Sequence, residues 1–362
     1  MPGQALPVTL SDFERAAADR LAPGPHGYYA GGAGDELTLR DNEAAWRRIA
    51  IRPRVLVDVS QRDLRTRVLD REHPHPVFVA PTAFHRLAHP DGERATARGA
   101  AAAEALYCLS SLATTTPAAV AEAAPGGRRW FQLYVFKDRG VSDALVDAAV
   151  AHGYEAIVVT ADLPVLGVRE RELRSGYAID AAELIPDLHS GDLALSDIGT
   201  LIDPSLTWED VERFAGACGL PVLVKGILTA DDAVLAADHG AAGVVVSNHG
   251  GRQLDTVRAG AEALAEVAEA AGDRLDVLVD GGVRRGTDVL KALALGARAV
   301  LVGRPVLWGL AVGGEDGVRT VLEILRGELD TALALAGVPR VADVDGSVLE
   351  PARWAGGVPF RA

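Results

Sequence analysis

The sequence predicts an α/β protein in which eight parallel strands close into a (β/α)8 barrel. From about residue 76 onward, short apolar runs alternate with Ala-rich stretches of helical spacing. Eight such runs occur, and most are apolar almost throughout, as expected for parallel strands buried on both faces. An open doubly wound sheet also alternates strands with helices, but the count of eight favours the barrel, the TIM-barrel fold.

The elements of this barrel can be placed along the chain. The expected strands are Val77–Ala80, Tyr107–Leu109, Trp130–Leu133, Ala156–Val159, Pro221–Val224, Gly243–Val246, Asp276–Val279 and Ala299–Val302. Helical spacing between them predicts Ala95–Ala105, Val141–His152, Asp231–His239, Ala261–Ala271 and Thr287–Leu295. Further helices are expected outside the barrel at Leu10–Leu21, Leu37–Ile49 and Gly317–Ala336.

No linker or low-complexity tract divides the chain, so a single domain over residues 1–362 is expected. It would consist of an N-terminal extension (1–75), the barrel (76–312) and a C-terminal helical tail (313–362). The polar, acidic stretch 174–206 between the fourth and fifth strands is long enough to form an active-site lid. A disordered surface loop is the alternative for its middle part.

Composition and charge exclude several classes of protein. Hydrophobic residues make up 49% of the 362-residue chain, too many for a disordered protein, and no long apolar run offers a membrane span. The formal net charge of −14 argues against a nucleic-acid or anionic-membrane partner. Cys108 and Cys218 cannot form a disulfide framework, and the N-terminus lacks a secretory pattern. We therefore expect a cytoplasmic protein that binds neither nucleic acid nor membranes, and we expect no metal site.

Residues suited to binding and catalysis gather directly after the predicted strands, where the active sites of such barrels lie. In strand order they are Pro81, Thr82 and Ala83; Ser110 and Ser111; Gln132 and Tyr134; Thr160, Asp162 and Arg169; Lys225; Ser247, Asn248, His249 and Arg252; Asp280, Gly281, Gly282 and Arg284; and Gly303 and Arg304.

A histidine and an arginine after the sixth strand suit a substrate that carries a carboxylate. His249 is followed by Gly250 and Gly251, which permit close approach of a ligand, and Arg252 can reach the same space. The guanidinium could hold the carboxylate while the imidazole takes a proton. Asp162 could orient the imidazole and stabilise its protonated form.

The fifth strand ends in Lys225, one of only three lysines in the chain. Its ammonium could form a Schiff base, stabilise an anionic cofactor, or close the mouth of the barrel in a salt bridge. The residues alone leave these alternatives open.

The last two strands end in glycines and arginines. Gly281, Gly282 and Gly303 leave backbone N–H groups unobstructed, and Arg284 and Arg304 add positive charge. Together they predict a phosphate site of the kind that barrels build after strands seven and eight. Tight-turn glycines and exposed arginines are the alternative for each residue taken singly.

Longer motifs carry a resemblance to a known family. The second half of the chain contains SNHGGRQLD, VLVKGI, DGGVRRGTDVLKALALGA and VLVGRPV, and the first half contains YYAGGAGDELTLRDN, APTAFHRLAHPDGE, LSSLATT, FQLYVFKDR and TADLPVLGVRE. Taken in their order along the chain, these motifs resemble the FMN-dependent 2-hydroxy-acid oxidases and dehydrogenases. That family includes glycolate oxidase, lactate oxidase, mandelate dehydrogenase and hydroxymandelate oxidase. The family has the (β/α)8 fold and uses FMN.

The resemblance implies a role for each candidate residue. His249 would be the base that acts on a 2-hydroxy acid, with Asp162 as its partner. Arg169 and Arg252 would hold the substrate carboxylate with help from Tyr28 and Tyr134, and Lys225 would stabilise negative charge at the N1/O2 side of the reduced flavin. The isoalloxazine ring would contact Pro81, Thr82, Ala83, Ser110, Gln132, Thr160 and Ser247; the ribityl chain and phosphate would contact Asp280, Gly281, Gly282, Arg284, Gly303 and Arg304.

Two positions bear on the substrate and the electron acceptor. Leu112 stands where plant-type glycolate oxidases carry Trp, which implies a substrate larger than glycolate, of lactate or mandelate type. Ala83 is typical of the oxidases, so we expect oxygen as acceptor and hydrogen peroxide as product. A dehydrogenase that uses a quinone or a protein acceptor is the alternative. Family members are commonly tetramers, so a homotetramer is implied.

Overall fold

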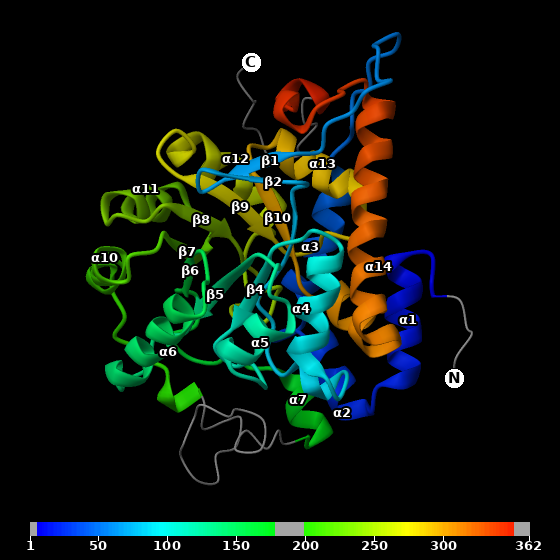
Figure 1. Cartoon of the computed structure of the whole chain (residues 1–362). Helices are drawn as coiled ribbons and strands as arrows, with labels where there is room; N and C mark the ends of the chain where they lie inside the picture. The colour runs from blue at the N-terminus through cyan, green and yellow to red at the C-terminus, as the bar shows by residue number, and fades with distance from the viewer. Residues whose placement is uncertain (1–5, 178–198, 351–362) are drawn as a thin grey trace.

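A closed barrel of eight parallel strands forms the centre of the molecule, as the sequence predicts (Figure 1). The computed structural model describes residues 6–177 and 199–350. Around the barrel the strands follow the order β10-β3-β4-β5-β6-β7-β8-β9, and Val300 of the last strand pairs with Val77 of the first. The strands are β3 (Val77–Val79), β4 (Tyr107–Ser110), β5 (Arg129–Leu133), β6 (Ile157–Thr160), β7 (Val222–Ile227), β8 (Gly243–Val246), β9 (Asp276–Asp280) and β10 (Ala299–Val302).

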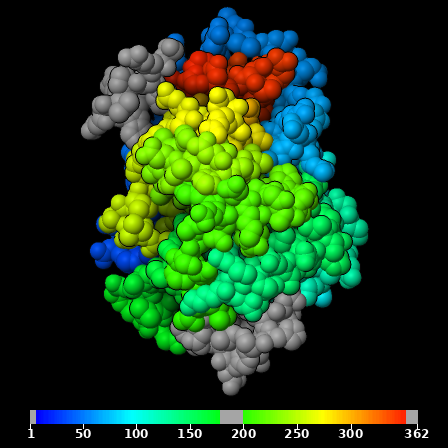
Figure 2. All heavy atoms as spheres, turned by 90° about the vertical axis from the view of Figure 1, so that its left-hand side faces the viewer, coloured from blue at the N-terminus to red at the C-terminus, as the bar shows by residue number. Residues whose placement is uncertain are grey.

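Helices surround the barrel and bury the outer faces of its strands. They are α4 (Gly92–Ala102), α5 (Pro117–Ala123), α6 (Arg139–Ala151), α10 (Trp208–Ala217), α11 (Ala230–Asp238), α12 (Gly260–Ala271), α13 (Gly286–Ala294) and α14 (Arg304–Ala336). In the space-filling view, α10, α11 and α12 cover one side of the barrel (Figure 2). The inner faces of the strands form a separate core that includes Phe78, Cys108, Trp130 and Leu278. Two apolar layers therefore hold the strands rigidly in place.

The N-terminal extension packs on the outside of this barrel and closes one end of it. Helix α1 (Leu10–Arg20) packs on α14, and α3 (Leu37–Arg48) packs on α12 and α13. A short hairpin of β1 (Thr66–Val68) and β2 (Arg71–His73) inserts the fully buried Val68 into the inner core. The backbone N–H of Leu69 donates to Asp276, at the start of β9, so the hairpin covers the N-terminal ends of the strands.

The structure differs from the expected elements at several places. Helix α14 begins at Arg304 instead of Gly317, and non-helical backbone at Gly313 and Gly314 breaks it near the expected start of the tail. Beyond Ala336 the described tail has only the short 3-10 helices η2 (Val341–Asp343) and η3 (Gly346–Val348). The sequence analysis missed the β1–β2 hairpin, α2 (Pro23–Ala30), α5, α10 and the 3-10 helix η1 (His85–Leu87).

Most of the expected lid, residues 174–206, lies outside the described residues. Its beginning overlaps α7 (Glu170–Ser175), which packs against α2. On the far side of the gap, Ile202 forms an isolated antiparallel bridge with Phe136. Within the described ranges, no helix has the length and apolar character needed to cross a bilayer.

Candidate active site

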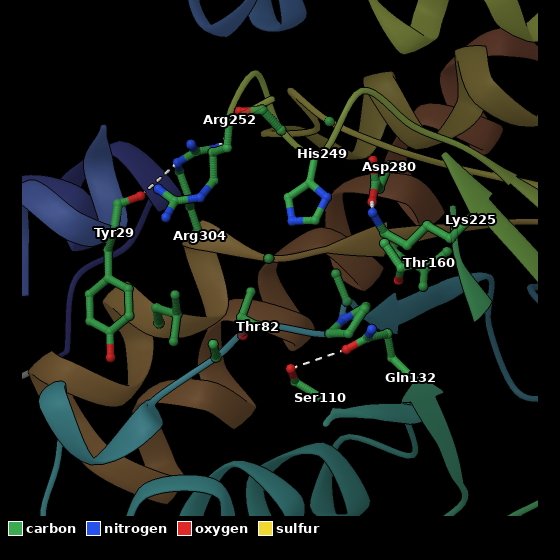
Figure 3. A pocket seen from close by; sticks show the side chains of 18 of the residues that line it. Tyr29, Thr82, Ser110, Gln132, Thr160, Lys225, His249, Arg252, Asp280 and Arg304 are labelled. Atoms are coloured by element: carbon green, nitrogen blue, oxygen red, sulfur yellow. Dashed lines mark hydrogen bonds and ion pairs between the residues drawn. The ribbon is translucent and has the colours of Figure 1, made fainter. Parts of the chain in front are cut away.

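A cavity opens at the C-terminal ends of the barrel strands, where the sequence places the site (Figure 3). Its wall contains all of the residues to which the resemblance assigns a role except Asp162 and Ser247; Ser111 and Asn248, which also follow the strands, do not line it. Asp162 and Ser247 lie directly behind it. Asp162 accepts a hydrogen bond from His249, and Ser247 Oγ accepts bonds from Lys225 Nζ at 2.9 Å and from the backbone N–H of His249 at 3.0 Å. Sequence positions more than 200 residues apart therefore meet at one site.

His249 is held between an acid and a phenol. Its Nδ1 lies 2.9 Å from Asp162 Oδ1, and its Nε2 lies 3.3 Å from the Tyr134 hydroxyl. Burial lowers the pKa of His249 below its ordinary value, although the Asp162 carboxylate opposes this shift. Burial alone would raise the pKa of Asp162, but His249 and Lys225 bring it below its ordinary value. The pair therefore combines a neutral imidazole with a carboxylate that can stabilise the imidazolium.

The backbone that carries His249 is a left-handed turn. His249, Gly250 and Gly251 have φ values of 59°, 63° and 73°, and Gly251 N–H donates to Asn248 O at 3.0 Å. A non-glycine residue in this conformation costs about 1 kcal/mol, so other contacts must hold it in place. Asn248 supplies them through a reciprocal pair of amide hydrogen bonds, at 2.8 and 2.9 Å, with Asn42 on α3.

Lys225 is a buried cation at the end of β7. Its Nζ lies 3.2 Å from Asp280 Oδ2, and Figure 3 shows the two groups facing each other. Burial would lower the pKa of Lys225, but Asp280 and Asp162 raise it above the ordinary value. The ammonium is therefore a fixed positive charge beside the cavity. A Schiff-base nucleophile would need the opposite shift, because only the neutral amine reacts.

Arg169 and Arg252 lie together in the wall of the cavity. The Arg252 guanidinium stacks 4.8 Å from the centre of the Tyr28 ring, and its Nη1 donates to Tyr28 O at 2.6 Å. Arg169 Nε donates to the backbone carbonyl of Arg252 at 3.3 Å. Burial lowers the pKa of Arg169, and the neighbouring Arg252 charge lowers it further. Both guanidinium groups also face Glu172, which the sequence analysis did not single out.

The glycines and arginines predicted for a phosphate line the same cavity, and Arg304 lies beside Arg252: both guanidinium groups donate to the backbone carbonyl of Gly31 (Figure 3). Gly281 and Gly282 have φ values of 90° and 77°, and a Cβ on Gly282 would lie 2.0 Å from Asn42 O. Arg304 donates to the carbonyl oxygens of Tyr29, Gly31 and Gly250, so its guanidinium mainly holds the surrounding loops together. Burial lowers the pKa of Arg304 to about 9. Gly303 and Arg304, at the N-terminus of α14, line the cavity, and a helix N-terminus favours an anion.

Comparison with known proteins identifies the family. The FMN-dependent dehydrogenase family profile matches residues 17–351. The chain belongs to this family. It is 46% identical to the L-lactate oxidase of Nostoc sp., over 96% of this chain and all of the relative, and 44% identical to 2-hydroxyacid oxidase 2 of Bos taurus, over 96% and 99%. A mandelate oxidase variant solved with (S)-mandelic acid superposes with a TM-score of 0.88 at 43% identity, covering 95% of this chain and 98% of that one.

The cavity fits the FMN of this family. Within the described residues, three buried atoms on its wall have no hydrogen-bond partner: Gln132 Nε2, Asp280 Oδ1 and Arg284 Nε. Gln132 is oriented by Ser110, whose hydroxyl donates to Gln132 Oε1 at 3.1 Å, so its amide N–H₂ remains available. An amide donor, a carboxylate acceptor and a guanidinium donor suit a flavin carbonyl, a ribityl hydroxyl and a phosphate respectively. FMN is the cofactor.

An apolar stretch of the cavity wall was only partly predicted. Leu163, Leu166 and Ile202 line it together with Leu112, and only Leu112 was singled out from the sequence. Leu163 and Leu166 follow β6 in the TADLPVLG motif, whereas Ile202 belongs to the stretch expected to form a lid. These four aliphatic side chains present apolar surface to the cavity, so this stretch, the apolar wall, suits an uncharged, apolar substituent.

Proposed function

We propose that this protein oxidises a 2-hydroxy acid to the 2-oxo acid with FMN and passes the electrons to oxygen, which gives hydrogen peroxide. The observation that carries the proposal is the placement of a neutral His249, paired with Asp162, beside two arginines in a cavity that fits FMN. The names of the relatives, lactate, hydroxyacid and mandelate oxidases, support oxygen as the acceptor.

The arginine pair would bind and orient the substrate. A carboxylate between Arg169 and Arg252 would receive charge-assisted hydrogen bonds from two guanidinium groups whose side chains are only 9% and 14% exposed. Its 2-hydroxyl is then directed toward His249 and Tyr134, whose Nε2 and hydroxyl atoms lie 3.3 Å apart. Burial raises the pKa of Tyr134, so its phenol stays protonated and can donate to the substrate oxygen.

His249 would take the proton that the hydroxyl releases. Its Nε2 is the acceptor on the cavity side, where the Tyr134 hydroxyl lies 3.3 Å away, because Nδ1 is engaged with Asp162. The imidazolium that forms is stabilised by the adjacent carboxylate. FMN, when bound, supplies the acceptor for the two electrons and the hydrogen that leave the substrate carbon. Lys225 would place its positive charge against the electron-rich edge of that ring.

The apolar wall supports a substrate larger than glycolate, of lactate or mandelate type. Leu112→Trp should fill the space that an aromatic substituent needs. We expect kcat/KM for mandelate to fall by about 100-fold while that for glycolate changes little, since overpacking excludes only the larger side chain.

Steady-state oxidation of glycolate, lactate and both mandelate enantiomers by the two proteins checks this expectation. Leu166→Val is the matched control, because it changes a side chain of the same wall but enlarges the cavity instead of filling it. Equal losses on glycolate and mandelate in Leu112→Trp would contradict the assignment of this wall to the substrate side chain.

The acceptor is tested by product stoichiometry. An oxidase consumes one molecule of O2 and releases one molecule of hydrogen peroxide for each molecule of 2-oxo acid formed. Negligible oxygen uptake, together with rapid turnover on a quinone-type dye, would instead establish the dehydrogenase alternative.

We further propose that the protein is a cytoplasmic homotetramer. The loop before β1 projects from the body of the molecule (Figure 1) and exposes 82% of Val55 and 103% of Leu56. Adjacent aliphatic side chains that are this exposed would lose their contact with water if another chain covered them. Light scattering should give the mass of four chains. Leu56→Asp should reduce this mass, whereas Val8→Asp, at another exposed position, should not. A monomeric wild-type protein would contradict the tetramer.

The two free cysteines favour the cytoplasm as the compartment. Fractionation of the source cells tests this location.

A further inference from the structure

A third charged residue, Glu172, belongs to the arginine pair. Its Oε1 lies 3.3 Å from Arg252 Nη2 and 3.7 Å from Arg169 Nη1. All three side chains are nearly buried, with exposures of 16% for Glu172, 14% for Arg252 and 9% for Arg169. One carboxylate is therefore shared by the two guanidinium groups that we propose hold the substrate.

The helix that carries Glu172 is anchored to the N-terminal extension by an ion pair. On the neighbouring position of α7, Arg171 Nη2 lies 2.6 Å from Glu36 Oε2, which ties the helix to the loop before α3. Glu36 in turn accepts from Gly32 N–H at 3.0 Å. The first residue of the helix, Glu170, instead pairs with the exposed Arg174, and its side chain is 39% exposed, against 16% for Glu172. Glu172 thus faces the site while Glu170 faces solvent.

The contacts also fix how much positive charge remains for a ligand. Arg252 Nη1 is already occupied by the carbonyl oxygens of Tyr28 and Gly31, and Arg252 Nη2 by Glu172. Because Glu172 compensates one of the two guanidinium charges, these three side chains together carry one net positive charge before a ligand binds, while the neighbouring Arg304 guanidinium already donates to three backbone carbonyls. A single substrate carboxylate makes it neutral. A second carboxylate would leave an uncompensated negative charge in a buried site, which is costly.

We propose that Glu172 sets the charge selectivity of the site: it makes the arginine pair a receptor for monocarboxylates and disfavours dicarboxylates. This inference rests on the proposed function only for the placement of the substrate carboxylate at the arginines. Glu172 acts through Arg169 and Arg252 and is therefore a specificity-determining residue, not a catalytic one.

The test compares the binding of two unreactive anions, acetate and malonate, to the FMN-loaded protein through the change in flavin absorbance. The measurement is made in a mildly alkaline buffer, so that acetate and both carboxylates of malonate are fully ionised. Glu172→Gln keeps the size of the side chain and removes its charge. We expect it to raise the affinity for malonate relative to acetate by about tenfold or more, since a like charge in a buried site has been removed.

Two variants serve as controls. Glu172→Asp keeps the charge and should retain the wild-type preference for acetate. Glu170→Gln makes the same charge change on the exposed side of the same helix and should leave the affinity ratio unchanged. The proposal would be overturned if Glu172→Gln left the ratio of the malonate and acetate affinities unchanged, even with both affinities reduced equally. It would also be overturned if Glu170→Gln changed this ratio as much as Glu172→Gln does.

The same selectivity should appear in turnover. The ratio of kcat/KM for tartronate, a 2-hydroxy dicarboxylate, to that for lactate should rise in Glu172→Gln. The outcomes for the two proposals remain separable: a wild-type protein that oxidises no 2-hydroxy acid contradicts the proposed function, whereas the anion ratio still tests Glu172 because it requires no turnover.

Discussion

Replacing His249 by Gln is expected to leave a yellow, FMN-containing protein in which substrate reduces the flavin about a thousandfold more slowly. Gln fills a similar space but cannot accept the hydroxyl proton, and a positioned general base contributes about 10²–10⁴ in rate. Anaerobic stopped-flow measurement of flavin bleaching checks this result. Substrate-driven reduction at the wild-type rate would remove His249 from the proposed role.

A second substitution separates the lost base from a disturbed backbone. His249 has a left-handed conformation, and Asn tolerates this conformation better than Gln does. His249→Asn should therefore keep the turn and lose the base, and it should be as slow as His249→Gln. Recovery of the rate in His249→Asn would show that the turn, and not the imidazole, was the cause.

The pKa of His249 also predicts the pH dependence of flavin reduction. The working form of the base is the neutral imidazole, and burial lowers its pKa from the ordinary value of 6.5. The rate should therefore be constant above neutral pH and fall only as the pH drops through that lowered pKa.

Replacing Arg252 by Met should mainly weaken substrate binding. The substitution removes one of two buried guanidinium partners of the substrate carboxylate, a change that typically costs about 3 kcal/mol, or roughly a 100-fold rise in KM. Arg252 also donates to Tyr28 O and Gly31 O, so part of the loss would come from the loop that it holds.

Arg252→Lys distinguishes these two contributions. Lysine keeps the positive charge but cannot bond two carbonyls and a carboxylate with one planar group. We expect an intermediate KM and a normal FMN content for Arg252→Lys. If KM and kcat both stayed at wild-type values in Arg252→Met, the substrate carboxylate would have to bind elsewhere.

The barrel and the position of its site followed from local patterns in the sequence. The strands are continuous apolar runs because both of their faces are buried, and parallel strands place their C-terminal ends at one end of the barrel. Residues just after each run, such as Gln132, Lys225 and His249, were therefore expected to meet, and the structure places them around one cavity.

What the sequence did not reveal depends on contacts between distant segments. Glu172 becomes significant only because α7 brings it against Arg252, and Asn42 only because α3 brings it against Asn248, 206 positions away. Arg304 was expected to serve the phosphate, yet in this structure its guanidinium donates to three backbone carbonyls.

Missed secondary structure has local causes. The β1–β2 hairpin has strands of only three residues, too short for a hydrophobic pattern, and α2 is rich in Gly and Pro. Helix α10 did carry a readable signal, because Thr207 and Asp210 form a capping box at its start.

The central claim is most directly tested by mixing the purified protein anaerobically with (S)-mandelate, (R)-mandelate, lactate and glycolate, and then admitting air. The account predicts that FMN is present, that an acid larger than glycolate bleaches its absorbance, and that air restores the colour rapidly with release of hydrogen peroxide. A flavin that none of the acids bleaches would contradict the assigned substrate class. A protein that neither contains nor takes up FMN would contradict the assignment of the cavity.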